Sequence, residues 1–150
     1  MRTAIFPGSF DPFTIGHADI VNRALGLFDH IYIGIGINNV KTATFPLEKR
    51  LADITDFYRG NDKVTVCSFS GLAVDFAKEH GAQFILRGVR MVADFEYERN
   101  MAQANKQLSG IETILLYTAP QYAHISSSLV RDLHKHNADI SAFLPNNQQL

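Results

Sequence analysis

The residues best suited to chemistry lie between Phe6 and His17, in the segment FPGSFDPFTIGH. The segment follows a short apolar run and precedes an amphipathic one, an order that indicates a strand, a tight turn and a helix. A helix N-terminus presents unpaired N–H groups and a partial positive charge, so it can hold a phosphate. Gly8 and Gly16 would let a ligand approach the backbone, and His17 adds a donor beside it. The segment favours a nucleotide phosphate site with a catalytic histidine, or else an ordinary strand–helix turn with a capping histidine.

A second candidate phosphate site is Arg87-Gly88-Val89-Arg90, which directly follows the apolar run at residues 84–86. A planar guanidinium binds phosphate with two donors at once, and a glycine between two arginines keeps the backbone close. Because the segment stands at the end of an expected strand, we favour a functional site over a solvated surface loop. Glu98 would then either orient these arginines or meet a ribose hydroxyl.

A third segment, ISSSLVR at residues 125–131, places three hydroxyls before an amphipathic helix. Serines and the first N–H groups of a helix can point at one spot and cradle a phosphate. On its own the pattern indicates an ordinary helix cap. Lys41, on its own, indicates a solvated loop residue.

The elements that must position these residues alternate along the chain. Apolar runs predict strands at residues 2–6, 30–37, 63–69, 83–86 and 112–117. Helical periodicity predicts helices at residues 16–28, from Pro46 onward, and at 72–80, 93–108 and 126–136, with a short turn at 143–144 and a fraying end at 146–150. We expect an α/β fold: a Rossmann-like, doubly wound, five-stranded parallel sheet with helices on both faces, forming one domain over residues 1–150.

Such a sheet binds ligands beyond the carboxyl ends of its strands. The polar residues that follow the five strands should therefore meet along one edge. They are Ser9 and His17; Asn39 and Lys41; Ser70 and Gly71; Arg87, Gly88 and Arg90; and Tyr122, His124 and Ser126–Ser128.

Composition excludes several classes of protein. With 150 residues, 46% hydrophobic and 19% charged, the chain is long and apolar enough for one globular core. A net charge of −1 argues against a general nucleic-acid binder. The single cysteine, Cys67, allows no internal disulfide and suits a reducing cytosol. Without a membrane-length apolar stretch or a signal-peptide pattern, we expect a soluble cytoplasmic protein with neither nucleic-acid nor membrane partners.

Missing motifs narrow the choice further. The chain has no G-x-S-x-G elbow, no GxxxxGK[ST] loop and no GxGxxG after its first strand, which disfavours hydrolases, P-loop proteins and dinucleotide oxidoreductases. His134 and His136 point to different sides of a helix and make a poor metal pair. We therefore assign no metal-binding residues.

Taken together, the sequence resembles the bacterial phosphopantetheine adenylyltransferases. The matching segments occur in family order over essentially the whole chain. They are Pro7–Pro12, the T-x-G-H at Thr14–His17, Asp19–Val21, Arg23-Ala24, Arg87–Arg90, Asp94–Glu98, Ile125–Ser128 and Phe143–Pro145. The T-x-G-H and serine segments are shared by a wider superfamily of nucleotidylyltransferases, whereas R-G-x-R and D-F-E-Y-E narrow the resemblance.

The resemblance implies transfer of AMP from ATP to 4′-phosphopantetheine, giving dephospho-coenzyme A and pyrophosphate in the penultimate step of coenzyme A synthesis. It also implies Mg²⁺ as cofactor and a homohexamer. By position in the family, the catalytic residues would be His17, Lys41 and Arg90. The residues implied for the acceptor are Ser9, Lys41, Ala73 and Arg87. The residues implied for ATP are Ser9, Phe10, His17, Gly88, Val89, Arg90, Glu98, Tyr122, Ala123, His124, Ile125, Ser126, Ser127 and Ser128.

Two other readings of the sequence stay open. A sister transferase would use CTP with a phospho-alcohol, or ATP with nicotinate mononucleotide. A regulatory module would bind nucleotide without catalysis, although binding alone does not require His17, Lys41 and Arg90 together. An aminoacyl-tRNA synthetase shares the two superfamily motifs, but this chain is too short for tRNA-binding domains and is not basic.

Overall fold

The computed structural model describes residues 1–146 and contains one five-stranded sheet. The strands are β1 (Thr3–Gly8), β2 (His30–Gly36), β3 (Val64–Phe69), β4 (Phe84–Val89) and β5 (Glu112–Tyr117). The helices are α1 (Ile15–Ala24), α2 (Leu47–Phe57), α3 (Ala73–Glu79), α4 (Val92–Ser109) and α5 (Ser127–Lys135), with 3₁₀ turns at Pro120–Tyr122 and Ser141–Phe143. None of these helices within residues 1–146 is long and apolar enough to cross a membrane. Residues 147–150, in the end expected to fray, lie outside the described part.

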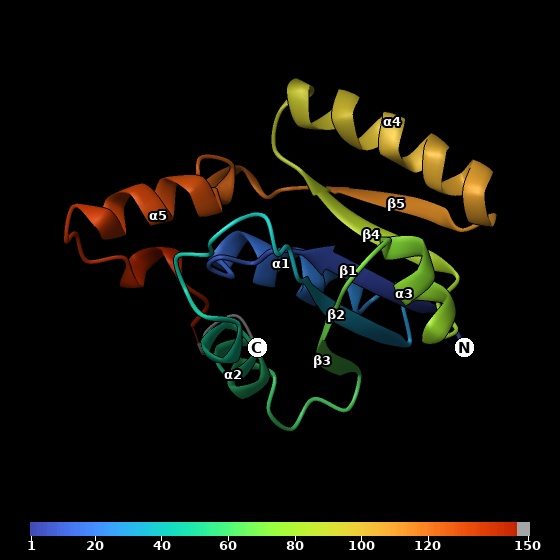
Figure 1. Ribbon diagram of the computed structural model, residues 1–150, viewed down its shortest axis with the longest axis horizontal. Helices are drawn as coiled ribbons and strands as arrows, with labels where there is room; N and C mark the ends of the chain where they lie inside the picture. The colour runs from blue at the N-terminus through green and yellow to red at the C-terminus, as the bar shows by residue number, and fades with distance from the viewer. Residues whose placement is uncertain (147–150) are drawn as a thin grey trace.

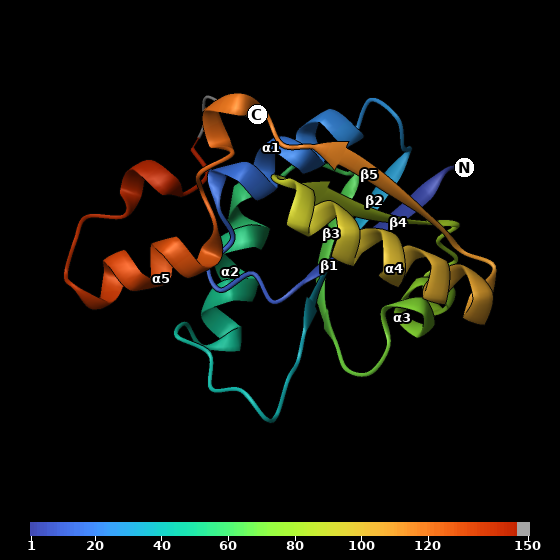
Figure 2. The same ribbon diagram turned by 90° about the horizontal axis from the view of Figure 1, so that it is seen from above.

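The strands are all parallel and follow the order β3-β2-β1-β4-β5. The chain builds outward from β1 to β3, then returns to the centre and builds outward through β4 to β5. Helices α1 and α2 cover one face of the sheet, and α3 and α4 cover the other (Figures 1 and 2). The order reverses between β1 and β4, which is where parallel sheets bind ligands. The predicted doubly wound α/β fold is confirmed.

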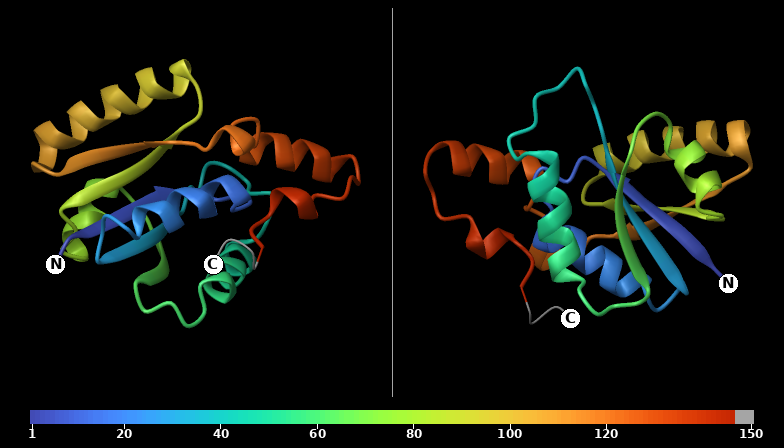
Figure 3. Two further views of the ribbon diagram at one scale, coloured as in Figure 1. Left: turned by 180° about the vertical axis from the view of Figure 1, so that it is seen from behind. Right: turned by 60° about the horizontal axis from the view of Figure 1, so that its bottom comes forward.

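Alternation along β1 divides the core between the two faces, because successive side chains of a strand point to opposite sides. Ala4 and Phe6 pack in the cluster that includes α1 and α2, whereas Ile5 packs in the cluster that includes α3. A third, smaller cluster joins Ile15 at the start of α1 to Ile125 and to Val130 of α5. This cluster holds α5 at the carboxyl edge of the sheet, beside the start of α1 (Figure 3).

Two strands extend further than the sequence predicted. β1 continues through Pro7 to Gly8, and β4 continues through Arg87 to Val89. β1 and β4 pair only at Ala4–Phe84 and Ile5–Ile85, while each stays paired to its outer neighbour to the end. Pro7 is tolerated because no ladder bond toward β4 is needed there. The expectation that Arg87 and Gly88 follow the strand is therefore wrong: both belong to β4 and line the gap that it leaves beside β1.

Candidate active site

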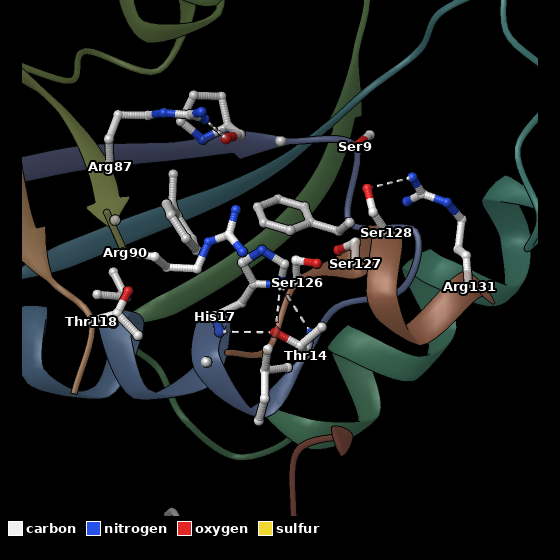
Figure 4. Close-up of a pocket in the computed structure, with 18 residues that line it drawn as sticks. Ser9, Thr14, His17, Arg87, Arg90, Thr118, Ser126, Ser127, Ser128 and Arg131 are labelled. Atoms are coloured by element: carbon white, nitrogen blue, oxygen red, sulfur yellow. Dashed lines mark hydrogen bonds between the residues drawn. The ribbon is translucent and has the colours of Figure 1, made fainter. Parts of the chain in front are cut away.

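A cavity of about 320 Å³ opens at the carboxyl edge of the sheet, where β1 and β4 separate (Figure 4). Three arginines and no carboxylates are among its lining residues, and α1 and α5 both begin beside it. Helix N-termini and arginines both favour negative charge, so the cavity suits a polyanion. It is lined by Phe6, Pro7, Gly8, Ser9, Phe10, Thr14, Gly16, His17, Ile20, Arg87, Gly88, Arg90, Thr118, Ile125, Ser126, Ser127, Ser128 and Arg131.

His17 is fixed by a reciprocal cap at the start of α1. Thr14 is the N-cap; its hydroxyl accepts from the His17 N–H (3.3 Å), and its own N–H donates to His17 Nδ1 (2.9 Å). Phe13 stacks on the imidazole with centroids 5.4 Å apart, and Phe10 meets its edge at 5.1 Å. His17 therefore caps α1, as one interpretation of the sequence predicted, and also lines the cavity, as the other required.

The same bonds define the tautomer of His17. Because Nδ1 accepts the Thr14 N–H, the proton of the neutral ring is on Nε2. Burial of the imidazole, together with the positive charges of Arg87 and Arg90, lowers the pKa of His17 from 6.5 to about 3. His17 is thus a neutral hydrogen-bond donor throughout the physiological range, and it has no free nitrogen with which to act as a general base.

This pKa predicts a pH-dependent stability. Between about 3 and 6.5 the unfolded chain binds a proton at His17 that the folded chain does not. The free energy of unfolding should therefore fall as pH is lowered through this window, by up to about 1.4 kcal/mol per pH unit. The matched variant is His17→Gln, since glutamine keeps the capping box without titrating. Urea unfolding from pH 4 to 7 should show a flatter profile for the variant; parallel profiles would contradict the assignment.

Arg90 and the start of α5 lie on two sides of His17. Figure 4 shows the Arg90 side chain beside the imidazole, with Ser126, Ser127 and Ser128 on the other side. Arg90 Nε lies 3.4 Å from an Asp94 carboxylate oxygen, whose bond to the Arg90 N–H (3.1 Å) holds the turn into α4. Arg131 donates to the Asp11 carbonyl oxygen (2.9 Å) and to the Ser128 hydroxyl (3.1 Å).

Arg87 bridges the gap between β1 and β4. Its Nε and Nη2 donate to the two carboxylate oxygens of Glu98 at 2.9 and 2.7 Å, and its Nη1 donates to the Pro7 carbonyl oxygen at 2.6 Å. Glu98 is buried in α4, so this paired carboxylate fixes the guanidinium plane. Three of the five N–H donors of an arginine are then used, and two remain for a ligand.

A second cavity, of about 500 Å³, adjoins the first and lies between the β3–α3 turn and α4. It shares Pro7, Gly8, Ser9 and Arg87 with the first cavity. Its other lining residues are more apolar. They are Gly36, Ile37, Asn38, Phe69, Gly71, Leu72, Ala73, Ile85, Tyr97, Glu98, Met101, Ala102, Asn105 and Thr113. Two ligands bound in the two cavities would meet beside Ser9 and Arg87.

The structure brings together most, but not all, of the residues expected at the site. Lys41 is exposed on the connection between β2 and α2 and lines neither cavity. Val89 is buried in β4, and residues 122–124 form the turn before α5 without lining either cavity. Ala73 and Glu98 line the second cavity only. The candidate site residues that line the first cavity are Ser9, Phe10, His17, Arg87, Gly88, Arg90, Ile125, Ser126, Ser127 and Ser128.

Sequence reasoning assigned no role to Thr118 and included Arg131 only as the last residue of the candidate segment 125–131, yet both line the first cavity. Arg131 lies one turn into α5 from Ser127 and Ser128, so the periodicity of that helix was the signal for it. Thr118 directly follows β5, at the carboxyl end of a strand, where a parallel sheet is expected to bind ligands. Gly8 has a packing role as well, because a Cβ there would come within 2.9 Å of the Phe10 ring.

Comparison with known proteins agrees with this geometry. Residues 5–133 match the family described as cytidylyltransferase-like. The chain is 52% identical over 150 residues to the phosphopantetheine adenylyltransferase of Bacteroides thetaiotaomicron, covering 100% of this chain and 99% of the relative. It is 51% identical to the enzyme of that name from Cytophaga hutchinsonii, covering 96% and 97%.

A solved structure from Vibrio parahaemolyticus, described as a nicotinate-nucleotide adenylyltransferase, superposes with a TM-score of 0.65. It covers 99% of this chain and 97% of that chain, at 16% identity, and so agrees in fold alone. The sequence relatives carry the narrower conclusion, because they share about half of all residues over the full length. The chain belongs to the cytidylyltransferase-like family and, within it, to the phosphopantetheine adenylyltransferases.

Proposed function

We propose that this chain transfers AMP from ATP to 4′-phosphopantetheine, forming dephospho-coenzyme A and pyrophosphate. The observation that carries the proposal is the meeting of two cavities at Ser9 and Arg87. The cationic cavity around His17 suits the triphosphate of ATP. The larger, more apolar cavity beside Ala73 suits the pantetheine arm of the acceptor.

The reaction needs placement of charge rather than a base. An oxygen of the acceptor phosphate, largely ionised at neutral pH, attacks the α-phosphorus of ATP. A new O–P bond forms, the bond from the α-phosphorus to the bridging oxygen breaks, and pyrophosphate leaves with that oxygen and its electron pair. The enzyme must bring two polyanions together and stabilise the charge that builds on the α-phosphate and on pyrophosphate.

Each group of the site has a role in this scheme. His17, neutral and protonated on Nε2, donates to an α-phosphate oxygen in the transition state. Arg90, with Ser126–Ser128 at the start of α5, holds the β- and γ-phosphates. Ser9 and Arg87 hold the acceptor phosphate, and Lys41 joins them from its loop when the acceptor binds.

Mg²⁺ is proposed to enter with ATP as part of the substrate. Within residues 1–146, no three His, Cys, Asp or Glu side chains are grouped so that they could hold a metal. Among the described residues, those that line the first cavity offer hydroxyls and guanidinium groups but no carboxylate. Since Mg²⁺ is commonly held through substrate phosphates and water, the nucleotide itself is the expected ligand.

The protein is also proposed to act in the cytoplasm as a homohexamer. Exposed apolar side chains on and beside α4 and β5 support self-association, among them Val92, Leu108 and Tyr117 at 75%, 65% and 78% exposure. Light scattering during size-exclusion chromatography would measure the assembly. A monomer at micromolar concentration would contradict it.

The function is tested by pyrophosphate release from ATP and 4′-phosphopantetheine. Parallel reactions replace ATP with CTP, or the acceptor with nicotinate mononucleotide or a phospho-alcohol. Release with ATP and phosphopantetheine only is the expected result. Release with another pair would identify a sister transferase, and nucleotide binding without any release would identify a regulatory module.

We expect Arg87 and Arg90 to contribute mainly to the binding of different substrates. Arg87→Ala should weaken phosphopantetheine more than ATP, and Arg90→Ala the reverse, because Arg87 lines both cavities and Arg90 only the first. Lysine at either position should rescue only in part, since it lacks the planar fork. Calorimetric titration of each variant with ATP and with phosphopantetheine measures the loss of affinity for each ligand.

The control for surface charge is Arg59→Ala, which removes an exposed arginine paired with Asp56. Arg87→Ala also removes the cation that pairs with the buried carboxylate of Glu98. Repeating the titrations with Arg87→Ala in a Glu98→Gln background separates that effect from loss of the ligand contact. Equal losses for both ligands in each arginine variant would contradict these separate contributions of Arg87 and Arg90.

A further inference from the structure

The connection between β2 and α2, residues 37–46, is joined to the loop after β1 through Asp11. The two carboxylate oxygens of Asp11 accept the backbone N–H groups of Thr44 (2.9 Å) and Phe45 (2.8 Å). Asp11 is only 7% exposed, so these bonds are charge-assisted and shielded from solvent. The part of the connection nearest α2 is therefore anchored on the loop after β1, residues 9–14, here named the phosphate loop.

Arg50 of α2 fastens the same two segments a second time. Its Nε donates to the Phe45 carbonyl oxygen at 2.9 Å, and its Nη1 donates to the Ser9 carbonyl oxygen at 2.6 Å. Asp11, in the phosphate loop, binds the connection, and Arg50, in α2, binds both the connection and the phosphate loop. The two side chains form a clamp, here named the Asp11–Arg50 clamp, across both segments.

Backbone strain lies between the two fixed points of the clamp. Phe10 has a φ of 45°, in the left-handed region that an aromatic residue seldom adopts. Ser9 on one side is held by Arg50, and Asp11 on the other is held to Thr44 and Phe45. The strained backbone places the Phe10 ring against His17, with centroids 5.1 Å apart. A residue in this conformation persists only where its surroundings over-determine it.

We infer that Asp11 and Arg50 are positioning residues that act on the reaction through the loop bearing Lys41. Lys41 lies three residues before Thr44, a span of at most about 10 Å of extended chain. The anchor at Thr44 and Phe45 thus decides how far Lys41 can reach, while the rest of the connection projects from the body (Figure 3). This inference rests on the proposed function, in which Lys41 meets the acceptor phosphate beside Ser9.

A double-mutant cycle tests the coupling. Asp11→Asn keeps the side-chain shape but loses one of the two acceptor oxygens. In the wild-type background it should lower kcat by about tenfold or more, with the KM for ATP nearly unchanged. In a Lys41→Ala background the same change should cost less than about twofold, because the loop no longer carries the group that the clamp positions.

A second pair of variants keeps the test decisive if Asp11→Asn folds poorly. Arg50→Lys retains the charge but cannot reach Phe45 and Ser9 with one planar fork. It should lower kcat and show the same dependence on Lys41. The matched controls are Asp56→Asn and Arg59→Lys, an exposed pair at the end of α2 that should leave kcat unchanged.

The outcomes separate the inference from the proposed function. Equal losses with and without Lys41 would show a merely structural clamp and overturn the inference, as would full activity of both clamp variants. Such results require an active wild type. A wild type that releases no pyrophosphate from ATP and phosphopantetheine would instead overturn the proposed function, and the inference with it.

Discussion

His17→Ala is expected to lower kcat by about a hundredfold or more while the Kd for ATP stays nearly unchanged. The reason is the fixed tautomer: Nε2–H is a donor held by the Thr14 cap on one side and by Phe13 and Phe10 on two others. A preorganised donor counts most where charge builds, on the α-phosphate in the transition state. Steady-state kinetics together with calorimetric ATP titration separate the two quantities.

His17→Gln provides the control for the helix cap. Alanine removes both the donor and the acceptor of the Thr14 N–H, whereas glutamine keeps the reciprocal cap. If the activity loss of His17→Ala came from a frayed α1, glutamine would restore activity. We expect His17→Gln to restore stability and to remain at least about tenfold slower than the wild type, since its shorter side chain does not present a donor at the Nε2 position. A variant that bound ATP poorly yet turned over normally would contradict the role assigned to His17.

The fold could be predicted because local signals agreed. Apolar runs of strand length alternated with helical periodicity, and Gly81 and Gly110 followed expected helices; both have positive φ angles in the structure. The ends of β1 and β4 could not be predicted. Pro7 and Arg87 are typical of loops, yet each lies at the end of a strand, in the part that has a partner strand on one side only. That one-sided pairing depends on the reversal of strand order, which no local window contains.

The site could be predicted only from one rule, that a parallel sheet binds ligands beyond the carboxyl ends of its strands. It brought Ser9, His17, Arg90 and the α5 serines to one edge, and they line one cavity. The rule says nothing of how side chains pair across elements. The bonds from Arg87 to Glu98 and from the Thr44 N–H to Asp11 join segments that only the folded chain brings together. Lys41 shows the opposite limit, because it follows β2 in the sequence and yet lines neither cavity in the structure.

The acceptor should be selected mainly by its phosphate. Ser9 and Arg87 stand where the two cavities meet, and Arg87 keeps two donors for a ligand after binding Glu98 and Pro7. In the proposed function, Lys41 would add a third group from the connection between β2 and α2. Charge-assisted hydrogen bonds each contribute roughly 1.5–3 kcal/mol, so loss of the phosphate should cost several orders of magnitude in binding. The pantetheine arm would add weaker contacts near Leu72 and Ala73, which line the second cavity.

Pantetheine without its phosphate is therefore expected to be neither a substrate nor a competitive inhibitor at concentrations that saturate with phosphopantetheine. It lacks the attacking oxygen as well as the anchor. Competition in the pyrophosphate-release assay and calorimetric titration of both compounds measure the gap in affinity. Lys41→Ala should narrow that gap, and Arg59→Ala, which removes an exposed surface charge, should leave it as it is. If pantetheine bound the wild type as tightly as phosphopantetheine, the arm alone would anchor the acceptor, and Ser9, Lys41 and Arg87 would need another role.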